Sequence, residues 1–61
     1  MNIKELRQML VLTQEELGEL LGVCRETVIG WESGKREMRI KNKRKLNELC
    51  ERRGIRPEWF M

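Results

Sequence analysis

The chain has 61 residues and a net charge of +3, and its 39% hydrophobic residues suffice for one small core. No apolar run approaches the roughly 18–20 residues of a bilayer-spanning helix, and no secretion-type hydrophobic stretch follows the first methionine. We therefore expect a single domain over residues 1–61, in the cytoplasm and with no membrane partner.

Residue types that carry most enzyme chemistry are scarce. Histidine is absent, and Cys24 and Cys50 lack the spacing of a zinc site. Neither cysteine has a neighbouring base, and no glycine-rich phosphate loop is present. We expect no enzyme, no metal or other cofactor and no small-molecule substrate. Without a sign of export, we expect reduced thiols rather than a disulfide.

The charges are unevenly distributed along the chain. Residues 1–24 carry two basic and four acidic side chains, a net charge of −2, whereas residues 25–61 carry 11 basic and six acidic ones, a net charge of +5. Such segregation suggests a surface that faces a polyanion, although a solvated basic face is the alternative.

The apolar spacing is helical along the chain, with no alternation typical of strands. A first helix is expected over about residues 2–10, where one apolar stripe consists of Ile3, Leu6 and Leu10. The sequence therefore predicts an all-α fold.

The clearest local signal marks a second helix over residues 14–21. Thr13 is a good N-cap, and Glu16 three residues later completes a capping box. Gly22 ends this helix. Its expected buried stripe consists of Leu17, Leu20 and Leu21.

A third helix is expected over residues 25–33, with Gly34 as its left-handed C-cap. Because only a tight turn after Gly22 separates it from the second helix, the pair forms a helix-turn-helix unit. Val28 and Trp31 would face the core. The opposite face mixes charge, bare backbone and an exposed apolar residue, in Arg25, Glu26, Ile29, Gly30 and Ser33.

A last helix is expected over about residues 42–53, with Asn42 as its N-cap and Gly54 at its end. Its expected inward residues are Leu46, Leu49 and Cys50. Pro57 would begin a short further turn over residues 57–60.

Basic residues gather at the start of the last helix, namely Lys41, Lys43, Arg44 and Lys45. The helix dipole is positive at this end, so each cation is unfavourable by about 0.3–1 kcal/mol at low salt. A bound phosphate would reverse that penalty, whereas the alternative is a solvated basic stretch.

Residues 3–36 resemble the lambda-repressor/Cro-like helix-turn-helix family, also called the xenobiotic-response-element type. The pieces "LTQEEL", "LLGV" and "WESGKR" carry the resemblance, and a weaker match continues through "LNELCERRGI". It implies a compact fold of four or five helices whose third helix enters the DNA major groove. It also implies close packing at Gly18 and an ion pair between Arg7 and Glu32.

Positions within this pattern indicate how DNA would be contacted. The expected base contacts are Arg25, Glu26 and Ile29. The expected phosphate contacts are Gln14, Thr27, Lys35, Arg36, Lys41, Lys43 and Arg44. Arginine suits guanine, glutamate accepts from cytosine N4, and an apolar side chain meets the thymine methyl.

Alternatives remain open for several of these residues. Arg25 would otherwise contact phosphate only, and Glu26 would simply compensate the helix dipole. Ile29 equally suits a protein interface or the rim of the core. Gln14 would be an ordinary polar residue of the first turn, and Thr27 would help to cap its helix.

Two positions depart from the family pattern. Gly30 falls where relatives usually present a polar base-reading side chain, so the third helix should read fewer base pairs. Val11 falls where relatives usually place glycine. Because a β-branched residue strongly disfavours positive φ, we expect the first interhelical turn to have a different shape.

Two functional hypotheses follow. The first is a sequence-specific double-stranded DNA-binding transcriptional regulator, a repressor, acting as a homodimer on a two-fold operator. The second is an antitoxin-like protein-interaction module, which Ile29 and Gly30 favour. An apolar tail would either make the dimer contact or cover the core, and it comprises Ile55, Trp59, Phe60 and Met61. Single-stranded nucleic acid is disfavoured because no aromatic residues interleave with the basic stretch.

Overall fold

The computed structural model describes residues 2–55, and within this range the chain forms four α-helices and no strand. The helices are α1 (Ile3–Met9), α2 (Gln14–Leu21), α3 (Arg25–Ser33) and α4 (Ile40–Arg52). The predicted all-α fold is confirmed. None of these helices is both long and apolar enough to cross a membrane. The turn predicted over residues 57–60 and the tail aromatics Trp59 and Phe60 lie outside the described residues.

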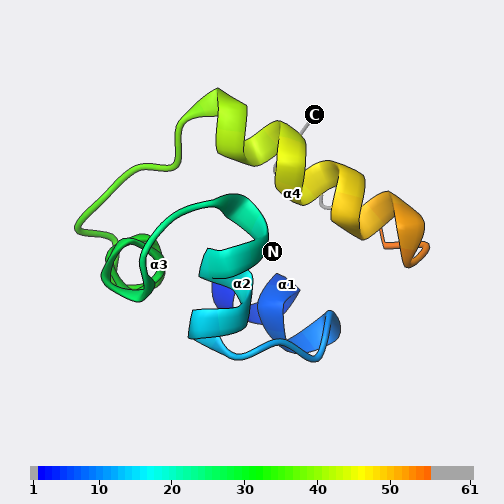
Figure 1. The fold of residues 1–61 in the computed structure, drawn as a ribbon, viewed down its shortest axis with the longest axis horizontal. Helices are drawn as coiled ribbons and strands as arrows, with labels where there is room; N and C mark the ends of the chain where they lie inside the picture. Colours follow the sequence, from blue (N-terminus) through cyan, green and yellow to red (C-terminus); the bar gives the residue numbers. More distant parts are fainter. Residues whose placement is uncertain (1, 56–61) are drawn as a thin grey trace.

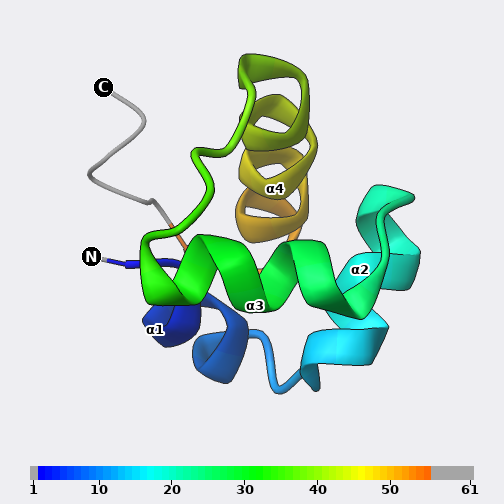
Figure 2. The same ribbon diagram turned by 90° about the vertical axis from the view of Figure 1, so that its left-hand side faces the viewer.

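Helix α2 is central to the arrangement, because it contacts both α3 and α4, while α1 contacts α3. In Figure 1, α4 runs above α1 and α2, and α3 lies to one side, viewed nearly along its axis. Figure 2 shows α3 across the front of the molecule, with the connector over residues 34–39 climbing from its end to the start of α4. One long side of α3 is therefore left facing away from the other helices.

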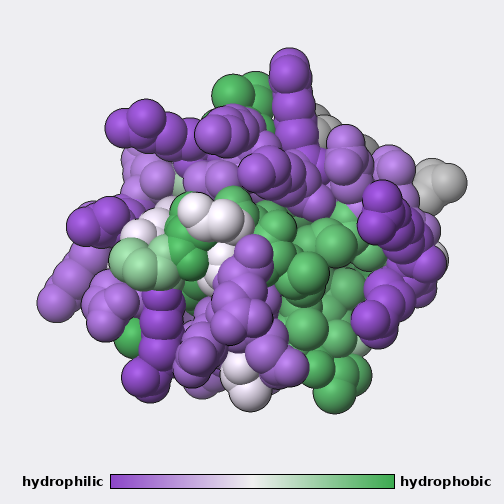
Figure 3. Space-filling view, viewed as in Figure 1, coloured by the Kyte–Doolittle hydropathy of each residue, from purple (hydrophilic) through white to green (hydrophobic). Residues whose placement is uncertain are grey.

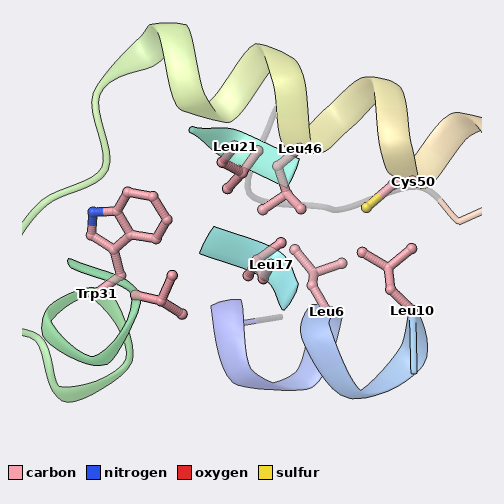
Figure 4. Packing of buried hydrophobic residues seen from close by; sticks show 8 residues of the cluster. Leu6, Leu10, Leu17, Leu21, Trp31, Leu46 and Cys50 are labelled. Atoms are coloured by element: carbon pink, nitrogen blue, oxygen red, sulfur yellow. The ribbon is translucent and has the colours of Figure 1, made fainter. Parts of the chain in front are cut away.

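The core lies between α4 and the other three helices. In Figure 4, Leu46 and Cys50 of α4 point toward Leu6, Leu10 and Leu17. The buried apolar residues are Leu6, Leu10, Leu17, Leu21, Val28, Trp31, Leu46 and Cys50. Ile3, Leu12, Val23, Met38, Leu49 and Ile55 pack partly buried against them. Both thiols are free, as expected, Cys24 being exposed and Cys50 buried.

One expected core residue is exposed. Leu20 has 52% of its surface accessible, so its placement in the buried stripe of α2 is wrong. The buried side of α2 consists of Leu17, Gly18 and Leu21. Leu20 lies about 100° around the helix from Leu21, which takes it off that side.

The start of α2 forms as its sequence predicts. The Glu16 backbone N–H donates to Thr13 Oγ1 at 3.1 Å, and the Thr13 backbone N–H donates to Glu16 Oε1 at 2.8 Å. These reciprocal bonds satisfy two N–H groups that have no partner within the helix. Gly22 then ends α2 in the left-handed conformation, with φ 73°. The predicted capping box is confirmed.

Position 18 holds a glycine because the backbone before α3 passes directly over it and leaves no room for a side chain. A Cβ atom at this position would lie 2.7 Å from the carbonyl oxygen of Val23. The Val23 backbone N–H also donates to the Gly18 carbonyl at 2.8 Å. The close packing expected at Gly18 is therefore confirmed, and it sets how near the α2–α3 turn comes to α2.

The turn between α1 and α2 has the left-handed shape despite its valine. Val11 has φ 57°, so the expected different turn shape is wrong. The Leu12 backbone N–H donates to the Arg7 carbonyl at 3.1 Å, and the Val11 N–H donates to the Gln8 carbonyl at 3.0 Å. These two bonds form a Schellman motif. Together with the packing of Leu12 on the core, they hold Val11 in a conformation that costs roughly 1–2 kcal/mol.

Helix α4 begins at Ile40, earlier than the predicted start at residue 42. Arg39 is its N-cap residue, and its carbonyl accepts the backbone N–H groups of Asn42 at 2.9 Å and Lys43 at 3.0 Å. Asn42 therefore lies inside the first turn, and its assignment as N-cap is wrong. The Arg39 side chain makes no capping hydrogen bond, so the sequence offered no residue type that marks this start.

Candidate nucleic-acid interface

Helix α3 has one buried and one exposed face. Val28 and Trp31 are buried in the core, as predicted. The exposed face carries Arg25, Glu26, Ile29 and Ser33. Ile29 is 39% exposed, so a branched apolar side chain stands among charged ones on the outer surface.

The sequence predicts Gly30 on the outer face of α3 as bare, exposed backbone, but in the structure Gly30 is buried. The side chain of Arg36 covers it. A Cβ atom at Gly30 would lie 3.0 Å from both Cγ and Cδ of Arg36. The left-handed turn at Gly34, with φ 80°, returns the chain along α3 and makes this contact. The backbone N–H groups of Lys35 and Arg36 both donate to the Gly30 carbonyl, at 3.0 and 3.1 Å.

The start of α3 leaves backbone N–H groups available to a ligand. Cys24 is the N-cap residue, and its side chain makes no capping hydrogen bond. Its Sγ lies 3.2 Å from Thr27 Oγ1, and this hydrogen bond lowers the pKa of the Cys24 thiol. The first N–H groups of a helix lack partners within it and carry partial positive charge. An anion such as a phosphate would satisfy them.

An ion pair attaches α3 to α1. Arg7 Nε donates to Glu32 Oε2 at 2.7 Å, which confirms the predicted pair. Arg7 Nη1 also donates to the Leu12 carbonyl at 2.9 Å. The guanidinium thereby joins the middle of α1, the α1–α2 turn and the last turn of α3.

Gln14 extends this network to the start of α2. Its Nε2 donates to Glu32 Oε1 at 3.2 Å, so the side chain supports α3. Among residues 2–55 the amide group makes this one side-chain hydrogen bond. Its second N–H is therefore available to a phosphate. Gln14 thus supports α3 and keeps a donor for the phosphate contact expected from the sequence.

The network keeps Glu32 ionised. Burial alone would raise the pKa of its carboxyl. The hydrogen bonds from Arg7 and Gln14 and the positive charge of Arg7 outweigh burial, so the pKa lies below its ordinary value. A charged Glu32 accepts all three hydrogen bonds, which fixes the orientation of α3 relative to α1 and α2.

The connector and the start of α4 form a basic region. Its exposed cations are Lys35, Arg36, Arg39, Lys41, Arg44 and Lys45. Lys43, in contrast, is half-buried, and it lines a hollow together with Trp31 and Arg36. The first turn of α4 contains no acidic residue. Sequence reasoning missed Arg39, because it placed the N-cap of this helix three residues later, at Asn42.

The predicted DNA-contacting residues lie on three neighbouring segments, namely the start of α2, the outer face of α3 and the connector with the start of α4. In Figure 2 the start of α2 lies below α3 and the start of α4 lies above it. In Figure 3 the surface is apolar between α4 and α1, at the end of the molecule away from α3. The three polar and basic segments thus border one side.

The fold and this exposed helix define a helix-turn-helix domain, since α2 and α3 are joined by the tight turn over residues 22–24. A family model described as helix-turn-helix matches residues 3–52. The chain belongs to the lambda-repressor/Cro-like helix-turn-helix family, whose members are DNA-binding regulators and typically not enzymes. No curated protein and no solved structure matches the chain significantly.

Proposed function

We propose that the protein is a sequence-specific double-stranded DNA-binding transcriptional regulator that acts as a repressor. The observation that carries this proposal is the outer face of α3, which a helix-turn-helix places in the major groove. On it, the guanidinium of Arg25 makes no hydrogen bond or ion pair with any described residue. A charged group on a fixed helix with no partner of its own is suited to an external acceptor.

Three side chains of this face would read bases. Arg25 suits a bidentate contact with guanine O6 and N7, and Glu26 suits acceptance from cytosine N4. Ile29 suits a thymine methyl group. Its partial exposure beside these two charges favours this role over a place in the core.

Phosphate contacts would supply most of the affinity on either side of α3. The residues we assign to this role are Gln14, Thr27, Lys35, Lys41, Lys43 and Arg44. The uncapped start of α4 supports the assignment, because positive side chains there oppose the helix dipole until an anion binds.

A domain this small offers limited contact with one groove. We therefore propose that two copies bind a two-fold operator, as symmetric operators require of helix-turn-helix dimers. Sedimentation with and without duplex tests this part separately. A monomer that binds one half-site alone would contradict the proposed dimer, but it would leave the proposed role of α3 in base recognition unchanged.

The salt dependence of binding tests the proposal. With about six phosphate contacts, affinity for a short random duplex should fall by about 10³-fold between about 50 and 200 mM salt. On a selected operator, Arg25→Ala should relax discrimination at one base position by roughly 1–3 kcal/mol. Lys41→Ala should weaken all sequences alike and reduce the salt slope by about 1.

A protein-interaction module is the alternative function, and exposed apolar side chains favour it. Met9, Val11 and Leu20 are exposed, and none lies on α3. No detectable binding to duplex at low salt would replace the proposed function with this alternative. Equal losses on every sequence from Arg25→Ala and Lys41→Ala would instead remove the base-reading role from Arg25 alone.

A further inference from the structure

Gly30 occupies an interior position of α3 that its backbone does not require to be glycine. Its φ is not positive, unlike those of Gly22, Gly34 and Gly54. Glycine is also among the least favourable residues inside a helix. The reason for a glycine must therefore lie in what approaches it, and the approaching group is the side chain of Arg36.

The stem of Arg36 fills the place of a side chain at position 30. A Cβ atom on Gly30 would lie 3.3 Å from Cβ of Arg36 and 3.0 Å from Cγ and Cδ. Three consecutive carbons of the stem thus lie along the surface of α3. The guanidinium is attached to Cδ through Nε, so it begins at the helix surface rather than out on the connector.

Gly30, which the stem of Arg36 covers, lies at the edge of the outer face of α3. Gly30 follows Glu26 by four residues and precedes Ser33 by three, so it adjoins both on the helix surface. Both neighbours are exposed. The guanidinium of Arg36 itself makes no hydrogen bond or ion pair with any described residue.

We propose that Arg36 is a specificity-determining residue that reads a guanine in the major groove, replacing the side chain that Gly30 lacks. The inference rests on the proposed function, and it revises the phosphate role that the sequence assigned to Arg36. Because the stem is already packed on α3, binding restricts little further freedom of the side chain. A planar guanidinium then offers the paired donors that guanine O6 and N7 accept.

The test is selection of duplexes from a random pool by the wild-type protein, Arg36→Lys and Lys35→Ala, followed by affinity measurements on the selected sites. Arg36→Lys keeps the stem and charge but loses the bidentate fork. We expect it to lose discrimination at one base pair by about five- to 150-fold, with random duplex bound as before. Lys35→Ala, the matched neighbour, should weaken all sequences equally.

A second variant tests the packing that carries the argument. Gly30→Ala adds a methyl group against the stem of Arg36, and we expect weaker discrimination at the same base pair in a protein whose far-ultraviolet circular dichroism is unchanged. Unaltered base preference in both Arg36→Lys and Gly30→Ala would overturn the inference and return Arg36 to a phosphate contact. Failure of the wild-type protein to bind any duplex at low salt would overturn the proposed function itself, and this inference with it.

Discussion

Arg7 on α1 and Glu32 on α3 meet in a 2.7 Å ion pair, and the same guanidinium donates to the Leu12 carbonyl at 2.9 Å. Both side chains are largely covered, with 14% and 9% of their surface exposed. The pair therefore does more than add surface charge. It fixes the last turn of α3, and with it the direction in which the outer face of α3 points.

Replacing Arg7 by methionine should destabilise the fold. The change leaves Glu32 Oε2 and the Leu12 carbonyl without their donor, although Gln14 still donates to Glu32 Oε1, and an unsatisfied, largely buried acceptor costs about 1–3 kcal/mol. Urea denaturation measures the free energy of unfolding. Gln8→Met on the exposed side of α1 is the matched control and should change it by less than about 0.5 kcal/mol. Equal effects from the two variants would show that the ion pair contributes nothing.

Stability should depend on Glu32 in acid. Its pKa in the folded protein is lowered from the ordinary value of 4.5, so the unfolded chain takes up its proton first as the pH falls. The contribution of ionised Glu32 to the free energy of unfolding is fully present above pH 4.5, and it is lost as the pH falls through the folded-state pKa. Thermal unfolding followed from neutral pH downward should show a weaker acid dependence for Glu32→Gln than for wild type. Glu48→Gln serves as the exposed control, and a Glu32→Gln profile parallel to wild type would exclude this linkage.

Gly18→Ala should destabilise the domain although alanine is the better helix former. The new methyl group would lie 2.7 Å from the Val23 carbonyl oxygen, a backbone atom that moves only if the α2–α3 turn moves. Overpacking of this kind costs about 1–3 kcal/mol, against a propensity gain of about 1 kcal/mol. We expect net destabilisation of about 1 kcal/mol in urea denaturation. Glu19→Ala, on the exposed side of α2, should be neutral or stabilising, and a stabilised Gly18→Ala protein would contradict the contact.

Val11→Gly should stabilise the domain. It removes a positive-φ cost of about 1–2 kcal/mol and introduces an entropic cost of about 0.5–1 kcal/mol. A net gain of about 0.5 kcal/mol should appear as a raised melting temperature. Glu19→Gly, in a regular helical position, should lower the melting temperature instead. A lowered melting temperature for both variants would mean that Val11 is not strained.

Much of this fold could be predicted because its signals are local. The capping box of Thr13 and Glu16, and the glycines at 22 and 34, act on neighbouring backbone groups, and they set the ends of α2 and α3 correctly. The start of α4 was not predictable in this way, since Arg39 has no side chain that caps. Helix α4 begins directly after Arg39 because the backbone of Arg39 is extended. That conformation depends on the path of the connector through the tertiary fold, not on the residue type.

The candidate site was predicted by position but not in its contacts. The pairing of Arg7 with Glu32 followed from the family pattern and was confirmed. The cover of Gly30 by Arg36 had no sequence signal, because it depends on how the chain turns after α3. The φ of Val11 was missed for a related reason, since surrounding hydrogen bonds and packing override the preference of one residue.

The most direct test of the central claim is the amide NMR spectrum of the protein titrated with a selected duplex. If α3 enters the groove, the largest shifts should fall on the amides of Arg25, Thr27, Lys35 and Lys41. Shifts concentrated on Val11 and Leu20 instead, with the α3 amides unchanged, would show that the duplex binds elsewhere and would contradict the account.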